Sequence, residues 1–272
     1  MELDLLRYIQ SAASPVLDVF FSAAVHLADP ALWLLLLLWL YWREKEAGRA
    51  AAYAVFTSTV LGRGLRGIFR LAGPAGEEGI RALLPDTGPT FPSDRVQRVA
   101  AGGSALSLWQ GGDALWIGSI AAMFLTAFGE MYLGGGYPRD VFVGLLLGVA
   151  AAWLCARLRD RALGHVGLYA ASWAVLTVLL PFGWSEEFLA AWGLLGGFAA
   201  GCAFEENFVR VGRQSEMAGV LFRLVTGTAL TGGIYALGGL LPESAPFAAV
   251  RLFATGFAGY GLCPMLFKKL RR

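Results

Sequence analysis

The chain consists mainly of long apolar runs separated by short charged turns, and this pattern restricts its possible folds more than any other feature. Of its 272 residues, 57% are hydrophobic and 15% are charged, whereas a soluble domain carries about a quarter charged residues. The runs are too long and continuous for barrel strands, in which apolar and polar residues alternate. Because only helices and closed barrels satisfy their backbone hydrogen bonds in lipid, the sequence predicts an all-α integral membrane protein, a polytopic helical bundle.

The apolar runs and their breaks predict a short amphipathic N-terminal segment followed by ten helices. We expect the helices near residues 14–28, 30–43, 47–71, 96–110, 113–130, 138–158, 164–181, 187–208, 216–240 and 246–268. They divide into a six-helix core over residues 1–160 and a four-helix C-terminal extension over residues 161–272. Several are shorter than the roughly 20 residues that a straight span needs, so the boundaries at Asp29-Pro30 and Gly111-Gly112 are left open.

Four clusters of Lys and Arg predict the orientation. With alternating helices, the clusters at residues 43–49, 157–161, 210–213 and 268–272 all fall on one side. Cytoplasmic loops are enriched in Lys and Arg, so we expect both termini in the cytoplasm. No basic tract is interleaved with aromatic residues, so no nucleic-acid partner is expected. The three cysteines are far apart and have no metal-ligand spacing, so no cofactor or metal is expected either.

The opposite face should be poor in Lys and Arg, but it carries seven arginines. They are Arg63, Arg66, Arg70, Arg81, Arg95, Arg98 and Arg139. Charges at membrane depth are costly unless they are paired, which leaves two interpretations. Either an anionic partner binds there, or the arginines form internal salt bridges to Glu77, Glu78, Asp86, Asp94, Glu130 and Asp140.

Several local features favour an anion on this face. Arg63 and Arg70 are seven residues apart and therefore lie on one helix face, and their planar guanidinium groups match phosphate oxygens. Ser93 opens the next predicted helix, where free backbone N–H groups favour an anion, and Asp140 lies near the start of another. Glycines 134–136 let the backbone approach a ligand closely. Together they predict a site for an anionic headgroup at the outer membrane surface.

The spacing of these residues resembles the motifs of the type 2 phosphatidic acid phosphatases, a family of membrane lipid phosphatases. The family's first motif is a Lys, six residues, then Arg-Pro. Here Arg63 and Arg70 are separated by six residues, with Arg in place of Lys and Leu71 in place of Pro. The resemblance covers about residues 5–160 and implies the family's six-helix core, while the C-terminal helices are weakly similar to the extension of some bacterial members.

The other two motifs keep their spacing but have lost their histidines. In the second, Pro-Ser-Gly-His, Pro92 and Ser93 are kept and Asp94-Arg95 replace Gly-His. The third motif is Ser-Arg, five residues, His, three residues, then Asp. Here Gly129-Glu130 replace Ser-Arg. Gly136 replaces the histidine there, and Asp140 is kept. The chain therefore looks like a degenerate member of the family.

The family mechanism needs both missing histidines. The resemblance implies that the third-motif His attacks phosphorus, its Asp orients it, and the second-motif His protonates the leaving oxygen. Gly136 has no side chain, and Arg95 stays protonated at ordinary pH, so it is a poor general acid. The chain has two histidines, His26 and His165. The predicted topology places neither of them among the motifs. We therefore expect no catalytic residue and a pseudoenzyme.

The leading interpretation is a protein of the bacterial cytoplasmic membrane that binds or translocates a phospholipid or polyprenyl-phosphate headgroup at its outer face. The expected substrate-binding residues are Arg63, Arg70, Ser93, Arg95, Arg98, Glu130 and Asp140. Two points stay open within it: Arg95 and Glu130 form either a closed ion pair or a pocket for a zwitterionic headgroup, and the oligomeric state is undetermined.

Two other interpretations are kept. One is an active lipid phosphatase or phosphotransferase that uses Asp94 or Asp140 as nucleophile, because carboxylates form phosphoryl intermediates in other enzymes. The other is a transporter or channel-like protein in which the ten helices form the pathway. The glycines of the C-terminal helices would allow close or mobile helix contacts, although small residues are ordinary at membrane helix interfaces.

Overall fold

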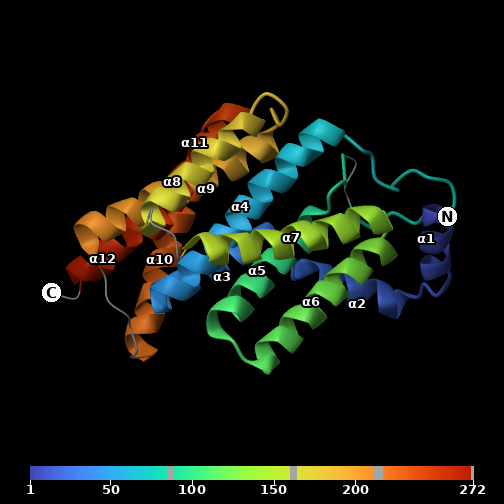
Figure 1. The fold of residues 1–272 in the computed structure, drawn as a ribbon, viewed down its shortest axis with the longest axis horizontal. Helices are drawn as coiled ribbons and strands as arrows, with labels where there is room; N and C mark the ends of the chain where they lie inside the picture. Colours follow the sequence, from blue (N-terminus) through green and yellow to red (C-terminus); the bar gives the residue numbers. More distant parts are fainter. Residues whose placement is uncertain (85–87, 160–163, 211–216, 271–272) are drawn as a thin grey trace.

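The protein is an all-α bundle, seen here in a computed structural model that describes residues 1–84, 88–159, 164–210 and 217–270 (Figure 1). The helices of the first part are α1 Glu2–Ser11, α2 Pro15–His26, α3 Pro30–Arg43, α4 Lys45–Phe69, α5 Asp94–Gln110, α6 Asp113–Tyr132 and α7 Pro138–Arg159. Those of the second are α8 Gly164–Leu176, α9 Glu186–Phe204, α10 Met217–Gly238, α11 Ala245–Phe257 and α12 Cys263–Leu270. The prediction of an all-α fold is confirmed over the described residues.

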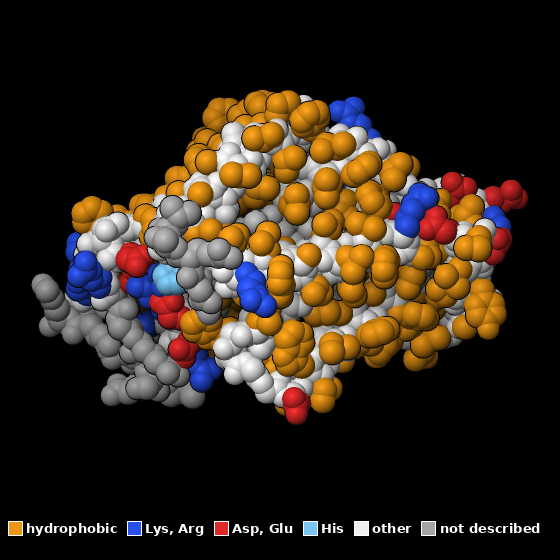
Figure 2. Space-filling view, in the orientation of Figure 1, with side chains coloured by type: hydrophobic (Ala, Val, Ile, Leu, Met, Phe, Trp, Pro, Cys, Tyr) orange, Lys and Arg blue, Asp and Glu red, His pale blue; other side chains and the backbone are white. Residues whose placement is uncertain are grey.

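The helices have the composition of a membrane protein. Five described helices are long and apolar enough to cross a membrane, or six if α2 and α3 form one bent span. Figure 2 shows apolar side chains over the middle of one face, with charged side chains gathered towards the two ends of the molecule. This distribution fits a bundle whose middle lies in hydrocarbon and whose ends lie at the membrane surfaces.

Two of the helix starts near the motifs are fixed by capping side chains. Asp29 accepts the backbone N–H groups of Ala31 and Leu32 through its carboxylate, at 2.8 and 3.1 Å. The hydroxyl of Ser93 accepts the N–H of Val96 at 3.2 Å. Both caps satisfy N–H groups that have no partner within the helix, and the second one places Ser93 at the entrance of α5.

The break at Asp29-Pro30 is a bend and not a surface loop. Helices α2 and α3 meet at 44° and pass the test for a membrane span only when taken together. Proline cannot continue the hydrogen-bond pattern of a preceding helix, so α2 stops, and Asp29 and Pro30 start α3 in a new direction. The expected helices near residues 14–28 and 30–43 are both present as α2 and α3, and the boundary that the sequence left open lies at the bend between them.

This bend puts the two ends of the chain at opposite ends of the bundle (Figure 1). We name the end that carries residues 90–95 and 134–140 the motif end. Helix α1 lies there, where the Gln10 amide donates to the backbone oxygens of Arg81 and Tyr132 at 2.9 Å. Lys268 of the last helix instead contacts the backbone of Val209 at the opposite end. The side of the membrane on which each terminus lies stays a prediction.

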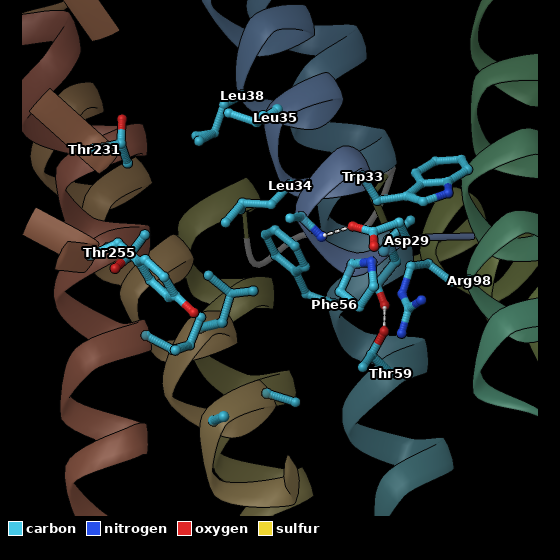
Figure 3. A pocket seen from close by; sticks show the side chains of 18 of the residues that line it. Asp29, Trp33, Leu34, Leu35, Leu38, Phe56, Thr59, Arg98, Thr231 and Thr255 are labelled. Carbon is cyan, nitrogen blue, oxygen red and sulfur yellow. Dashed lines mark hydrogen bonds between the residues drawn. The ribbon is translucent and has the colours of Figure 1, made fainter. Parts of the chain in front are cut away.

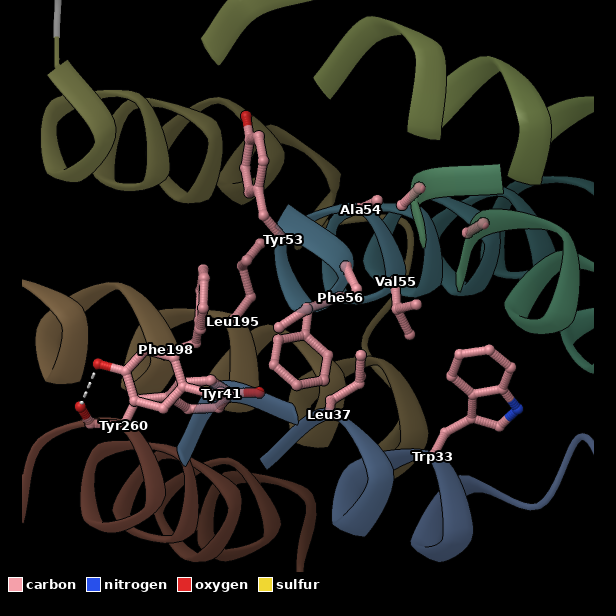
Figure 4. Packing of buried hydrophobic residues seen from close by; sticks show 14 of the residues in the cluster. Trp33, Leu37, Tyr41, Tyr53, Ala54, Val55, Phe56, Leu195, Phe198 and Tyr260 are labelled. Carbon is pink, nitrogen blue, oxygen red and sulfur yellow. Dashed lines mark hydrogen bonds between the residues drawn. The ribbon is translucent and has the colours of Figure 1, made fainter. Parts of the chain in front are cut away.

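The C-terminal helices pack directly on α3 and α4. Phe56 of α4 contacts Phe198 of α9 with ring centroids 5.6 Å apart, and Phe198 contacts Tyr260 at 4.8 Å (Figure 4). The Tyr41 hydroxyl donates to the Tyr260 backbone oxygen at 3.1 Å. A side chain at Gly197 would collide with the backbone of Phe253, so this glycine serves the close packing of α9 on α11.

A polar network ties the two parts together at the opposite end. Glu205 is buried and forms an ion pair with Lys45 at the start of α4. Arg223 of α10 is also buried and donates to the Trp42 backbone oxygen at 2.7 Å. Buried charges are tolerated where they are paired, so these residues fasten the C-terminal helices to the α3–α4 turn.

Candidate functional site

Three of the predicted site residues meet in a buried hydrogen-bonded group at the motif end. The Ser93 hydroxyl donates to Oε2 of Glu130 on α6, and the Ser93 backbone N–H donates to the backbone oxygen of Asp140 at 2.9 Å. All three residues are buried. Residues at the start of α5, near the end of α6 and at the start of α7 therefore come together, as the motif spacing along the chain predicts. We name this group, with Thr90, Asp94, Arg95 and Arg98, the motif network.

Glu130 and Arg95 form an ion pair. The Arg95 Nη1 lies 3.6 Å from the Glu130 Oε1, and the carboxylate is 1% exposed while the arginine side chain is 23% exposed. Gly136 lies beside the same carboxylate, since a Cβ atom there would be 3.4 Å from Glu130 Oε1. Gly136 and Arg95 therefore flank Glu130, whose charge is neutralised by Arg95.

Asp140 is held by neighbours that the motif spacing did not indicate. Its Oδ2 accepts the Thr90 hydroxyl at 2.7 Å and the Tyr137 backbone N–H at 3.0 Å. Arg139 lies 3.5 Å from its Oδ1. Burial and the nearby Glu77 carboxylate raise the pKa of the Tyr137 hydroxyl. Asp140 thus organises the loop before α7, and Thr90 could not be found from a motif because it lies in an irregular segment.

Asp94 lies between two guanidinium groups. Its Oδ2 is 2.6 Å from Arg98 and 3.3 Å from Arg63, and Arg98 also donates to the Ala28 backbone oxygen. The arrangement links the start of α5 to α4 and to the bend between α2 and α3. Two of the predicted phosphate ligands are therefore already paired with a carboxylate of the chain.

Internal pairing accounts for five of the seven arginines at the motif end. They are Arg63 and Arg98 with Asp94, Arg81 with Asp18, Arg95 with Glu130, and Arg139 with Glu2 and Asp140. Among the described residues, no carboxylate pairs with Arg66 or Arg70. Their Nε atoms donate instead to the backbone oxygens of Pro92 and Gly67, each at 2.9 Å. Asp86, another expected partner, lies outside the described residues.

The remaining arginines line an open crevice. This space of about 960 Å³ lies between α4 and the C-terminal helices, and Arg63, Arg66 and Arg70 line it on the α4 side. Arg251 of α11 lines it from the other side, held by a hydrogen bond of 3.0 Å to the Tyr235 backbone oxygen and by the Tyr235 ring 3.7 Å away. We name this space the arginine crevice; Glu186 and Glu187 also line it.

Arg66 and Arg251 were not among the predicted site residues. Arg66 is one helical turn from Arg63 and Arg70, so it could have been included from its spacing alone. Arg251 is isolated in an apolar helix far along the chain, and only the packing of α11 brings it to the crevice. Arg70, at the C-terminal end of α4, has a left-handed backbone with φ of 50°.

Neither histidine joins the motif network. His26 ends α2 and is exposed, and His165 lies in the first turn of α8. The hydrogen bonds and ion pairs described for the network involve no histidine. In the described parts of the chain, no group of three or more His, Cys, Asp or Glu is placed to hold a metal ion.

Two comparisons show what this chain is similar to. The family described as PAP2 superfamily phosphatase, transmembrane extension, matches residues 189–272. The crystal structure of LpxE from Aquifex aeolicus is similar at a TM-score of 0.53 and 29% sequence identity, covering 57% of this chain and 94% of that chain. No curated protein matches the chain. The family match and the structural match together confirm the resemblance to the PAP2 lipid phosphatases.

Proposed function

We propose that this chain, a membrane protein of the PAP2 lipid phosphatase superfamily, binds the phosphate headgroup of a lipid at the motif end without hydrolysing it. The lipid is a phospholipid or a polyprenyl phosphate of the bacterial cytoplasmic membrane. The orientation predicted from the Lys and Arg clusters puts the motif end outside the cytoplasm. The division into a core and a C-terminal extension is part of the same proposal.

The first support comes from the motif network, where the groups that would carry out the reaction are absent or engaged. Gly136 offers no nucleophile, and Arg95 is paired with buried Glu130. Asp140 is fully buried, its Oδ2 accepts two hydrogen bonds and its Oδ1 lies 3.5 Å from Arg139, so both oxygens face groups of the chain itself. A residue can act as nucleophile or acid only within hydrogen-bond reach of the reacting atoms.

The observation that carries the proposal is the second support: arginines without a carboxylate partner line an open space beside the motif network. Among the described residues this holds for Arg66, Arg70 and Arg251, all on the arginine crevice. Guanidinium groups bind phosphate oxygens through charge-assisted, often paired hydrogen bonds. Arginines that face a lipid headgroup region without internal neutralisation are what binding of an anionic headgroup requires.

The test is binding of lipid phosphates to the purified full-length chain in nanodiscs, followed by native mass spectrometry. Phosphatidic acid and undecaprenyl phosphate are compared with diacylglycerol, which lacks the phosphate. We expect one or both lipid phosphates to stay bound while diacylglycerol does not. Equal retention of all three lipids would contradict the proposal, and the difference between the two phosphates identifies the preferred lipid class. Headgroup transfer across liposomes distinguishes static binding from translocation.

A second candidate function is phosphoryl transfer through Asp94. Its Oδ1 is buried and has no hydrogen-bond partner, while Arg63 and Arg98 hold the other oxygen. A free carboxylate oxygen between two guanidinium groups could attack a phosphate monoester, form an acyl phosphate and release the lipid alcohol. In that case Asp94→Asn should abolish phosphate release and vanadate should stabilise the protein against heat. Absence of both effects removes this candidate.

A further inference from the structure

An apolar cavity adjoins the arginine crevice inside the bundle. It has a volume of about 520 Å³ and lies between α3, α4, α9, α10 and α11 (Figure 3). Leu34 and Leu38 face Thr231 and Thr255 across the space. Its volume is within the range of roughly 300–1,000 Å³ that small-molecule sites occupy. The cavity is therefore large enough to hold part of a ligand.

Three of the four threonines that line the cavity direct their hydroxyls to their own helix. Thr59 donates to Val55, and Thr255 to Arg251, each to the backbone oxygen one turn earlier at 2.8 Å. Thr231 makes the same kind of bond to Gly227. A hydroxyl that bonds to its own helix does not need a partner from a ligand, so this part of the wall suits a hydrocarbon.

The cavity and the crevice adjoin each other. Both are lined by Arg63, Ala190, Tyr235 and Leu252. Arg63 of α4 lines the cavity at the motif end, whereas Val55 and Phe56 line it two helical turns further into the bundle. The joined space is charged at the membrane surface and apolar inside, which is the polarity of a lipid phosphate.

The cavity also opens sideways towards the bilayer. Leu35 of α3 and Tyr235 of α10 line it and are 46% and 43% exposed. Gly232 of α10 lines the same opening and is exposed. An empty apolar space loses the dispersion contacts of its wall, and the hydrocarbon next to this opening can fill it. A lipid can therefore enter between α3 and α10 without leaving the membrane.

We propose that this cavity holds one aliphatic chain of the lipid whose phosphate binds in the arginine crevice. The chain passes between α3 and α10 and lies against α4, α9 and α11. The headgroup part of this inference rests on the proposed function, whereas the chain site depends only on the cavity and its opening. The ligand is accordingly a membrane lipid phosphate, and a water-soluble phosphate ester lacks the part that fills the cavity.

The chain offers a matched pair of variants on one helix. Gly232 lines the cavity and Gly233 does not, and a Cβ atom at either position meets nothing within 4 Å. Gly232→Phe should therefore fill the opening without disturbing the fold. Gly233→Phe adds the same side chain one residue along and serves as the control, with thermal unfolding to verify that both variants are folded.

The experiment uses phosphatidic acid with a diazirine in one acyl chain, incorporated into nanodiscs with the full-length protein and activated by light. In the unmodified chain we expect labelling of Leu34, Leu38 and Thr231, identified by mass spectrometry of peptides. Gly232→Phe should lose this labelling and Gly233→Phe should keep it. Labelling restricted to the outer surface, or cavity labelling that Gly232→Phe leaves intact, would overturn the chain site.

A diacylglycerol probe with the same diazirine separates this inference from the proposed function. If the phosphate anchors the lipid, phosphatidic acid should label the cavity more strongly than diacylglycerol. Equal cavity labelling by both probes would leave the chain site standing and contradict headgroup binding in the crevice. Stronger binding of phosphatidic acid than of diacylglycerol, without cavity labelling, would support headgroup binding in the crevice and contradict the chain site.

Discussion

The motif network and the arginine crevice lie side by side at one end of the bundle. Charged side chains in the network form ion pairs, whereas most arginines of the crevice have no carboxylate partner among the described residues. In the network, Glu130 is buried with Arg95 beside it, and Asp94 lies between two arginines. In the crevice, Arg66 and Arg251 are held only by backbone oxygens and the Tyr235 ring. The contrast indicates that the charges at the motif positions are engaged with one another, whereas arginines outside the network are available to a ligand.

Arg63 connects the two regions. It pairs with Asp94 at 3.3 Å and also lines the crevice and the apolar cavity. A bound phosphate would therefore lie next to an arginine whose charge is partly neutralised by the motif network. In the proposed function, the phosphate thus binds beside the motif network and in contact with it through Arg63.

The largest effect is expected from breaking the motif network at Glu130. Glu130→Ala removes the acceptor of the Ser93 hydroxyl and the partner of Arg95. Loss of one partner from a buried pair costs on the order of 3 kcal/mol of unfolding free energy. Thermal unfolding in detergent measures it. Arg70→Gln in the crevice is the control and should leave the melting temperature unchanged; equal melting temperatures for both variants would contradict the contrast.

The second largest effect is expected on the affinity for lipid, with no change in the stability of the fold. The double variant Arg70→Gln, Arg251→Gln removes two crevice charges and should weaken binding of phosphatidic acid by about tenfold to a hundredfold, as for the loss of a charge-assisted hydrogen bond. Arg81→Gln is the matched control, because Arg81 lies at the same end but is paired with Asp18 outside the crevice. A loss of affinity as large for Arg81→Gln would show that only total charge matters.

The smallest effect is expected at the acidic residues of the crevice. Glu186 and Glu187 line it and are exposed, so they oppose an anion through water. Replacing both by Gln should raise the affinity for phosphatidic acid about twofold to fivefold at low salt, and less at high salt, because exposed charges are weak and screened. Titrations at two salt concentrations measure this. A fall in affinity would instead indicate that a cationic part of the headgroup contacts these carboxylates.

Much of the fold follows from local sequence. The apolar runs gave helices close to their observed positions, and Ser93 was recognised as the start of α5 because capping depends on neighbouring residues. The sequence leaves the boundary at Asp29-Pro30 open, because whether two short helices form one span depends on what packs around them.

The site could also be predicted only in part from the sequence. Motif spacing indicated that Ser93, Glu130 and Asp140 belong together, and the structure brings them into one hydrogen-bonded group. The spacing could not reveal Thr90, whose contact with Asp140 arises from an irregular loop. It also could not reveal Arg251, since the distance along the chain between α4 and α11 carries no information on their packing.

The central claim is that the chain holds a lipid phosphate and does not cleave it. The most direct measurement follows both bound lipid and released inorganic phosphate when purified protein in nanodiscs is incubated with phosphatidic acid. The account predicts that phosphatidic acid stays bound and that phosphate release does not exceed that of empty nanodiscs. Sustained phosphate release that Asp140→Ala or Asp94→Asn abolishes would contradict it.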